Sequence, residues 1–334
     1  AESPEFVERF LDEGRLVVQL THGNIAQVFD MGNVDGTYFL AMEHVDGSDL
    51  RRLLRHLNSE KTQLPIGLAL HIISQSARGL SYAHTRTNEQ GDNLGIIHRD
   101  VSPSNMMLSR HGEVKLLDFG IAKATSRMME SISGSLHGKF LYMSPEQASG
   151  LPLDNRSDLF SLGICAYETL TGQRPFNGDN DLHTLELVRH GQYEKPTRIR
   201  PEIPDNVEQI LERCLATKPA DRYASAEEAQ RAIQEVLVEL RMVVTNSDLA
   251  AFIGPHIDTV NNAPLGLDAA LNQQLDALIS PASLAQSTQM VPPKSDVAFD
   301  DTRTGTPERS LVAPIGVDTA TSRSRITPVP STQI

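Results

Sequence analysis

The sequence predicts an α+β fold, with a small N-terminal part of one helix and two strands followed by a larger, mainly helical part. Three observations predict it. Apolar residues recur at helical spacing in the opening segment, strand-like runs flank a turn within residues 25–45, and the helical period dominates from about residue 48 to 241. With 334 residues, the chain is long enough for one or two packed cores.

The opening segment has the pattern of a helix start. Ser3 is expected as the N-cap and Pro4 at the first helical position, where the missing N–H of proline costs nothing. Glu13 then falls within an apolar stripe, and on an isolated helix it would lie at the edge of that stripe and reach water. The stripe consists of Phe6, Phe10, Val17 and Leu20.

The next elements follow from changes in the hydrophobic period. Residues 25–45 predict two strands around a turn at 33–36, and helical periodicity begins at about Ser48. The polar segment 85–95 predicts a surface loop or small hairpin. Two further strands are expected around the runs MMLS and VKLLDF, separated by the turn RHGE. Several helices should then continue to about residue 241.

Composition sets the remaining boundaries. Beyond Asn246 the order weakens, with one or two short apolar stretches to about Ile279, and Ser, Thr and Pro dominate from there on. Residues 244–334 are therefore expected to form a flexible, largely disordered tail. We therefore divide the chain into residues 1–45, 46–243 and 244–334. The net charge of −13 argues against nucleic-acid binding, which needs a basic surface.

The cysteines and the lengths of the apolar runs indicate the cellular compartment. Cys165 and Cys214 each lie in an apolar, helical-looking segment and are expected to be buried small hydrophobes. A disulfide is possible in principle, but two separate cysteines without a secretory signal favour a reducing compartment. No apolar run has the length of a membrane span. We expect a cytoplasmic protein without a span in this chain.

The most informative stretch is IIHRDVSPSNMMLSRHGEVKLLDFG, residues 96–120. The triplet His98-Arg99-Asp100 is followed by Asn105, then by the expected strand–turn–strand, and then by Asp118-Phe119-Gly120. Each fixed position lowers the odds of coincidence by a factor of roughly 20. In order and spacing the stretch resembles the catalytic and magnesium-binding loops of bacterial eukaryotic-like serine/threonine protein kinases.

The resemblance implies a protein kinase-like fold, with a partial N-lobe in residues 1–45 and a mainly helical C-lobe in 46–243. It also implies ATP and Mg²⁺ as cofactors and a protein as the substrate. Asp100 would orient the substrate hydroxyl and accept its proton, and Asn105 and Asp118 would supply oxygen ligands to Mg²⁺. Without the joint spacing, these residues would be ordinary loop and turn positions.

Further motifs agree with the resemblance. They are Tyr142-Met143-Ser144-Pro145-Glu146, Asp158-Leu159-Phe160-Ser161-Leu162-Gly163 and Lys218-Pro219-Ala220-Asp221-Arg222-Tyr223. By resemblance, Glu146 should pair with Arg222, and Asp158 should bond the backbone near His98 and Arg99. The packed spine between the lobes should consist of His98, Phe119, Val17 and Val28.

The resemblance also implies an ATP site. Glu13 occupies the position of the glutamate that pairs with a lysine on the third strand of the family fold, and Met42 that of the gatekeeper. The Glu43 carbonyl and the Val45 N–H would bond adenine, with Asp49 near the ribose and Met107 below the ring. Taken alone, Met42 and Met107 would be plain core residues.

Three positions depart from the family pattern. First, residues 1–12 contain neither a glycine-rich loop nor the strand lysine. We expect an N-terminally truncated kinase, inactive as an isolated chain, and the alternative is a pseudokinase-like binding or scaffold module. Second, Ser102 stands where serine/threonine kinases usually carry lysine. Third, Lys139 stands where they usually carry threonine, so its ammonium could replace the missing one.

The resemblance predicts ATP-dependent phosphorylation of serine and threonine in proteins, as in signal transduction. Tyrosine kinases carry arginine where this chain has Ser102 or Ser104, which disfavours tyrosine specificity. A small-molecule phosphotransferase is disfavoured by the Ser144-Pro145-Glu146 motif. Because Arg99 adjoins Asp100, we expect control by phosphorylation in the loop before Tyr142, at Ser133 or Ser135. The alternative is that Ser133 and Ser135 simply belong to a flexible loop without a regulatory role.

Overall fold

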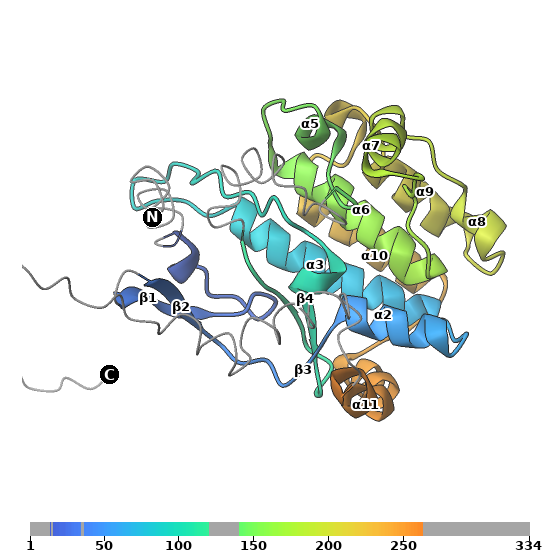
Figure 1. Cartoon of the computed structure of the whole chain (residues 1–334), viewed down its shortest axis with the longest axis horizontal. Coiled ribbons are helices and arrows are strands. Elements are labelled where there is room, and N and C mark those ends of the chain that lie inside the picture. Colours follow the sequence, from blue (N-terminus) through green and yellow to red (C-terminus); the bar gives the residue numbers. More distant parts are fainter. Residues whose placement is uncertain (1–13, 15, 35–36, 120–139, 263–334) are drawn as a thin grey trace, which may run out of the picture. The chain divides into compact units, whose positions relative to one another are not determined.

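The computed structural model describes residues 14, 16–34, 37–119 and 140–262 (Figure 1). The strands are β1 (Val28–Val34), β2 (Thr37–Met42), β3 (Gly47–Asp49), β4 (Met106–Ser109) and β5 (Val114–Leu116). The α-helices are α2 (Leu50–Ser59), α3 (Ile66–His84), α5 (Pro145–Ala148), α6 (Asn155–Thr171), α7 (Asp181–His190), α8 (Pro196–Ile199), α9 (Asp205–Cys214), α10 (Ala226–Glu239) and α11 (Asn246–Asn262). Two short 3₁₀ helices are η1 (Pro103–Asn105) and η2 (Pro219–Asp221).

The first sheet is the hairpin that the sequence predicted. β1 and β2 pair antiparallel, and their register brings Val34 opposite Thr37 and Val28 opposite Met42. Beyond the ladder, the Glu43 N–H donates to the Gln27 carbonyl at 2.8 Å. The end of β2 is therefore held beside the start of β1. Together with the mainly helical remainder, this confirms the predicted α+β fold.

The second sheet has the order β3-β4-β5, with antiparallel pairing throughout. β4 and β5 match the two strands expected around MMLS and VKLLDF. β3 differs from the sequence prediction, which began a helix at about Ser48. Residues 47–49 instead pair with β4, and α2 starts at Leu50 because the Asp49 side chain accepts a hydrogen bond from the Arg52 N–H at 2.9 Å.

Two helices form the centre of the helical part. α3 and α6 pack against each other, α10 covers α3, and α9 packs on α6 (Figure 1). Because neighbours cover them on several sides, both helices bury most of their residues, including Ser76 and Asp158. Cys165 and Cys214 are buried and carry free thiols, as expected of small hydrophobes. Burial raises the pKa of the Cys214 thiol to about 12.

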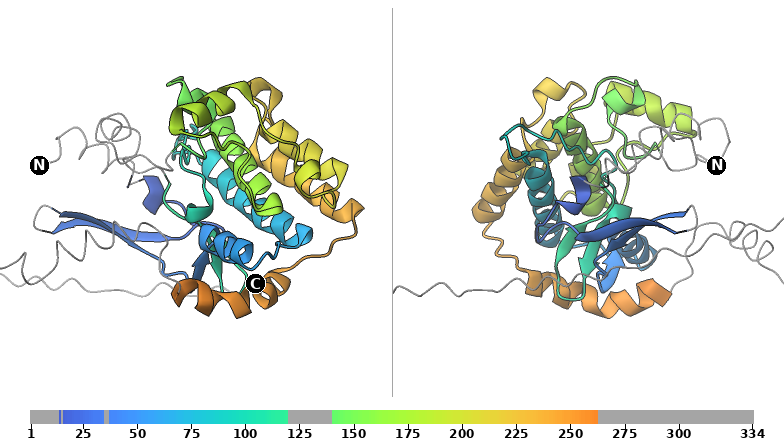
Figure 2. Two further views of the ribbon diagram at one scale, coloured as in Figure 1. Left: turned by 45° about the vertical axis from the view of Figure 1, so that its right-hand side comes forward. Right: turned by 90° about the vertical axis from the view of Figure 1, so that its left-hand side faces the viewer.

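α11 corrects the predicted tail. The sequence predicted a flexible, largely disordered tail over 244–334 with one or two short apolar stretches, and the structure places Asn246–Asn262 in a helix that packs on α2 and β3 (Figures 1 and 2). Its buried stripe is Leu249, Ile253, Ile257 and Val260. An isolated helix of this length is marginal in water, so the surface that receives the stripe decides its formation. Residues 263–334 lie outside the described residues.

Polar contacts fix α11 at both ends. The Asn246 side chain is bonded to His71 Nε2 at 3.0 Å, and Asn261 Nδ2 donates to the Gly47 carbonyl at 3.0 Å. Between them, Arg110 forms ion pairs with Asp46 and Asp258.

Among the helices that the structure describes, none combines the length and apolar character needed to cross a lipid bilayer.

Gly112, in the β4–β5 turn, offers a test of how closely α11 is docked. Its φ is +76°, and a Cβ there would lie 1.8 Å from the Asn246 carbonyl oxygen. Gly95, with φ +61° and no atom within 4 Å of its Cβ position, is the matched control. Both alanine variants incur the left-handed backbone cost of about 1–2 kcal/mol.

Gly112→Ala should lower the free energy of unfolding clearly more than Gly95→Ala does. It should also speed amide hydrogen exchange within residues 246–262, because the new methyl group pushes the helix start away. Urea unfolding and exchange mass spectrometry measure both effects. Equal destabilisation with unchanged exchange would contradict the close approach.

Candidate active site

The loop from Ile96 to Asn105 leads into β4 and carries two of the predicted catalytic residues, Asp100 and Asn105. Two residues of the site have unusual backbone conformations: φ is +64° at Arg99, in this loop, and +50° at Asp118, after β5. Residues other than glycine rarely adopt this left-handed region, and such conformations persist only where the surroundings hold them. The conformations of Arg99 and Asp118 therefore depend on the contacts that surround this loop.

Asp158, from the first turn of α6, binds the backbone of the loop. Its two carboxylate oxygens accept the N–H groups of His98 and Arg99, each at 2.8 Å, as the sequence predicted. His84 Nε2 lies 2.7 Å from the same carboxylate. Burial is the largest influence and acts to raise the pKa of Asp158, but the His84 contact and the loop amide outweigh it and hold that pKa below its usual value.

His98 links the loop to the segment that follows β5. Its Nε2 donates to the Leu117 carbonyl at 2.8 Å, and its Nδ1 accepts the Asp100 N–H at 3.3 Å. Burial lowers the pKa of His98, which keeps the ring neutral and suits one donor and one acceptor nitrogen. The His98 and Phe119 ring centroids are 4.4 Å apart. Val17 and Val28 are buried in the same apolar core as Phe119.

Asp100 and Asn105 are brought into contact. Asn105 Nδ2 donates to the Asp100 carbonyl at 2.8 Å and to its carboxylate at 2.9 Å. The Leu117 N–H donates to the Asn105 carbonyl at 2.9 Å, which ties Asn105 to the segment leading to Asp118. Both of these contacts use the Asn105 amide nitrogen, and among the described residues none donates to the amide oxygen, which a cation could therefore bind. An amide oxygen with the Asp118 carboxylate is a donor set that suits Mg²⁺.

The residues predicted for ATP lie along the end of β2 and on β3 and β4. Met42 ends β2 and is 38% exposed, rather than buried as a core residue would be. Asp49 and Met107 lie directly opposite each other in the β3–β4 ladder, so the structure brings these two together. Val45 is partly buried in the segment between β2 and β3.

Glu43 has a partner that the sequence did not indicate. Its carboxylate forms an ion pair with Lys115 of β5 at 2.8 Å and accepts the Gln27 N–H at 3.1 Å. Burial acts to raise the pKa of Glu43, but the Lys115 contact outweighs it and the net shift is downward. This pair ties the segment after β2 to the sheet that carries Met107.

Four predicted site residues are not placed. Glu13, Ser133, Ser135 and Lys139 lie outside the described residues. Ser102 is described and buried, and it accepts the Asn105 N–H at its carbonyl at 3.0 Å.

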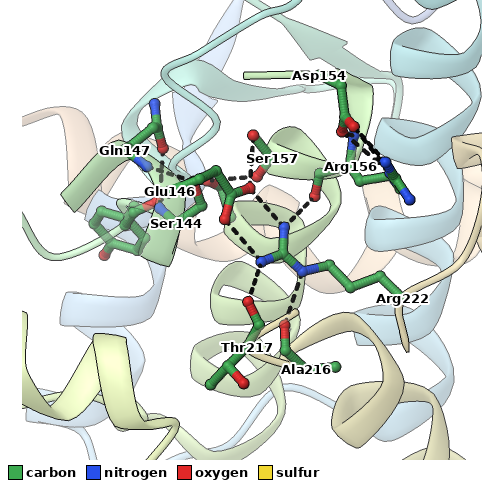
Figure 3. A network of polar contacts seen from close by, with 11 residues as sticks. Ser144, Glu146, Gln147, Asp154, Arg156, Ser157, Ala216, Thr217 and Arg222 are labelled. Atoms are coloured by element: carbon green, nitrogen blue, oxygen red, sulfur yellow. Dashed lines mark hydrogen bonds and ion pairs between the residues drawn. The ribbon is translucent and has the colours of Figure 1, made fainter. Parts of the chain in front are cut away.

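Glu146 and Arg222 form the predicted pair, drawn in Figure 3. The contact is bidentate, with nitrogen–oxygen distances of 2.7 and 2.9 Å, and the Arg222 side chain is 0% exposed. Ser157 donates to Glu146 at 2.6 Å, while Arg222 also donates to the carbonyls of Arg156, Ala216 and Thr217 (Figure 3). Burial acts to raise the pKa of Glu146, but Arg222 and Ser157 lower it below its usual value.

Sequence reasoning missed the role of α5. Ser144 accepts the Gln147 N–H at 3.3 Å, and the Gln147 side chain accepts the Ser144 N–H at 2.9 Å, which is a capping box. Gln147 Nε2 also donates to the Arg99 carbonyl at 2.8 Å. The Ser-x-x-Gln spacing was a usable signal for the cap. No local pattern pointed to the bond with Arg99 or to His84.

Comparisons with known proteins agree with this geometry. The family described as protein kinase domain matches residues 1–235. The tyrosine-protein kinase MasK of Myxococcus xanthus is 42% identical over 254 residues, covering 76% of this chain and 39% of MasK. The serine/threonine-protein kinase PknA of Mycobacterium tuberculosis is 38% identical over 227 residues, covering 66% of this chain and 49% of PknA.

The likeness extends to a solved structure. The PknI kinase domain of Mycobacterium tuberculosis is similar with a TM-score of 0.53 and 30% identity, over 70% of this chain and 80% of that one. The chain spans half or less of the length of the curated relatives named above.

The buried ion pair predicts an acid-sensitive stability. Glu146→Gln keeps the shape of the side chain but leaves Arg222 without its anion, and should cost about 3–5 kcal/mol of unfolding free energy. Because the folded-state pKa of Glu146 lies below its usual 4.5, the wild-type contribution is complete above that pH and is lost as the pH falls through the folded-state value. In the Glu146→Gln variant, the free energy of unfolding should therefore fall less steeply as the pH is lowered through the acid range.

The matched control is Glu227→Gln, which removes an exposed pair with Arg231 at 3.3 Å. That change should cost about 0.5 kcal/mol or less. Urea unfolding from neutral pH to below pH 4.5 separates the two. Similar losses in both variants would mean that the buried pair adds nothing specific.

Proposed function

Because this chain belongs to the protein kinase family, we propose that it transfers the γ-phosphoryl group of ATP to serine and threonine hydroxyls of protein substrates. The observation that carries this proposal is the Asp100 carboxylate held by Asn105 at 2.9 Å, on a loop whose backbone Asp158 fixes. Phosphoryl transfer depends chiefly on such positioning, since little covalent chemistry falls to the protein.

The proposed reaction assigns a role to each side chain. The substrate hydroxyl oxygen bonds to the γ-phosphorus, the bond from that phosphorus to the bridging oxygen of ADP breaks, and the hydroxyl proton passes to Asp100. Asn105 would keep the Asp100 carboxylate turned toward the hydroxyl. Asn105 and Asp118 would hold Mg²⁺, which when bound offsets the negative charge of the phosphates.

The nucleotide would lie against the segment after β2. We propose hydrogen bonds from adenine to the Glu43 carbonyl and the Val45 N–H, with Met42 behind the ring and Met107 below it. Asp49 would reach the ribose, and its position opposite Met107 supports this assignment. The Lys115–Glu43 ion pair would keep the Glu43 backbone in place.

The residue phosphorylated has two candidates. PknA is named a serine/threonine kinase, and this chain has serine at 102 and at 104, where tyrosine kinases carry arginine at one position or the other, which favours serine and threonine. MasK, the relative with 42% identity, is named a tyrosine kinase, and that likeness favours tyrosine as the second candidate.

The buried free thiols accord with a reducing compartment, for which we propose the cytoplasm.

Control by phosphorylation is part of the proposal. Arg99 is fixed from two sides, since Asp158 accepts its N–H and Gln147 donates to its carbonyl. A guanidinium on a fixed backbone is a ready partner for a phosphate. Ser133 and Ser135 stay our proposed sites for that phosphate.

The central test replaces Asp100. In a longer chain that adds a glycine-rich loop and lysine upstream, Asp100→Asn should lower kcat on the order of 10²–10⁴-fold, because the proton acceptor is lost. Residues 1–334 alone should transfer little phosphate, since residues 1–12 contain neither the glycine-rich loop nor the strand lysine of the family. Transfer from labelled ATP to a protein mixture, followed by phosphoamino-acid analysis, measures rate and specificity together.

Three outcomes count against parts of this proposal. Activity that survives Asp100→Asn would remove Asp100 from the chemistry. Phosphotyrosine as the main product would overturn the serine/threonine assignment. ATP binding without transfer in the longer chain would instead support the alternative of a pseudokinase-like binding module.

A second test concerns Lys139. We propose that its ammonium takes the place of the lysine usually found at the position of Ser102 and contacts the γ-phosphate or Asp100. Lys139→Met should then lower kcat on the order of 10²-fold. The double variant Ser102→Lys with Lys139→Thr should recover much of that loss. The control is Lys61→Met, at an exposed lysine just after α2. A kcat within a few-fold of wild type would show that Lys139 plays no such part.

A further inference from the structure

Two histidines and a glutamate converge where α11 lies on α2, away from the residues assigned to the reaction. His56 lies in the last turn of α2, Glu60 is the C-cap residue that follows that helix, and His256 comes from α11. His56 Nε2 lies 3.1 Å from His256 Nδ1 and 3.6 Å from Glu60 Oε1. The three donor atoms all lie within 4.8 Å of one another. We propose that they bind a Zn²⁺ ion that fastens α11 to α2.

The distances suit one shared ion. Zn²⁺ binds imidazole nitrogen and carboxylate oxygen at roughly 2.0–2.2 Å. Two nitrogens 3.1 Å apart then subtend roughly 98° at the metal. The nitrogen and oxygen 3.6 Å apart subtend roughly 120°. These angles lie on either side of the tetrahedral value of about 109° that Zn²⁺ prefers.

The third contact needs an adjustment of the exposed carboxylate. A tetrahedral ion with ligand distances of roughly 2.1 Å needs two ligand atoms about 3.4 Å apart, and His256 Nδ1 and Glu60 Oε1 lie no more than 4.8 Å apart. The Glu60 side chain is 52% exposed and can rotate, whereas His56 is only 14% exposed and packs edge-on against the His256 ring. Three protein ligands would leave the fourth position of the ion to water.

The contacts leave the carboxylate for a cation to engage. His56 Nε2 lies 3.1 Å from the His256 ring nitrogen, within hydrogen-bond range, and 3.6 Å from the Glu60 carboxylate, beyond that range. The Glu60 carboxylate therefore gains no hydrogen bond from His56. A cation at the centre attracts all three donor atoms at once.

The donor set indicates which cation. Two imidazoles and one carboxylate suit Zn²⁺, whereas Mg²⁺ and Ca²⁺ prefer oxygen ligands throughout. The proposed ion is therefore chemically distinct from the Mg²⁺ assigned to Asn105 and Asp118. Its site also includes a helix beyond residues 1–235, the part that matches the family.

The site would act on a helix next to the proposed nucleotide site. α11 contacts both α2 and β3, and β3 carries Asp49 opposite Met107 (Figures 1 and 2). An ion that binds only the docked arrangement of α11 stabilises that arrangement by mass action. Zn²⁺ should therefore order α11 against the strand that carries Asp49.

The experiment titrates ZnCl₂ into nucleotide-free chain 1–334 by calorimetry, with Co²⁺ absorption as a spectroscopic probe of the coordination. We expect one equivalent of Zn²⁺ to bind, and amide exchange in residues 246–262 to slow on binding. His256→Ala and Glu60→Gln should each weaken Zn²⁺ affinity at least tenfold and abolish the slowed exchange. MgCl₂ should not reproduce either effect.

His183→Ala is the matched control, because His183 and Asp179 form another histidine–carboxylate pair four residues apart, at 3.7 Å, that belongs to no three-ligand group among the described residues. It should bind Zn²⁺ as the wild type does. Glu60 is exposed, so Glu60→Gln tests the ligand even if His256→Ala loosens the helix. Absence of stoichiometric binding in the wild type, equal affinity in either ligand variant, or unchanged exchange in residues 246–262 would overturn the site.

Discussion

The buried carboxylate of Asp158 is the interaction on which the active-site loop depends. Removing an anion from water is costly unless hydrogen bonds replace the lost hydration, and here the amides of His98 and Arg99 and the ring of His84 do so. The same bonds hold Arg99 in its left-handed conformation. One side chain on α6 thus links the centre of the helical core to the position of Asp100.

A second buried charge organises the other side of the loop. The Glu146–Arg222 pair joins α5 to the segment after η2, and Arg222 also satisfies three backbone carbonyls. With α5 fixed, Gln147 reaches the Arg99 carbonyl at 2.8 Å. Both backbone groups of Arg99 are therefore held by elements whose own positions depend on buried ions. Such pairs stabilise weakly in net terms but tolerate few alternative arrangements.

The folded unit continues past the family's match at residue 235. α11 covers α2 and β3 with an apolar stripe and is tied by Arg110, whose guanidinium bridges Asp46 and Asp258. The bridged carboxylates raise the pKa of Arg110, so it stays charged. Because α11 adjoins the strand that carries Asp49, any change in its docking is positioned to affect the proposed nucleotide site.

Sequence alone determined what depends on short-range order: the β1–β2 hairpin, the strands flanking the RHGE turn, and the motif spacing on which the proposed roles of Asp100, Asn105 and Asp118 rest. These signals are local because period and turn chemistry act over a few residues. Tertiary packing alone decided that residues 47–49 form a strand and that residues 246–262 form a docked helix. It also decided that His56 meets a ring 200 residues away. Such contacts depend on which surfaces come together, and no window of sequence contains both partners.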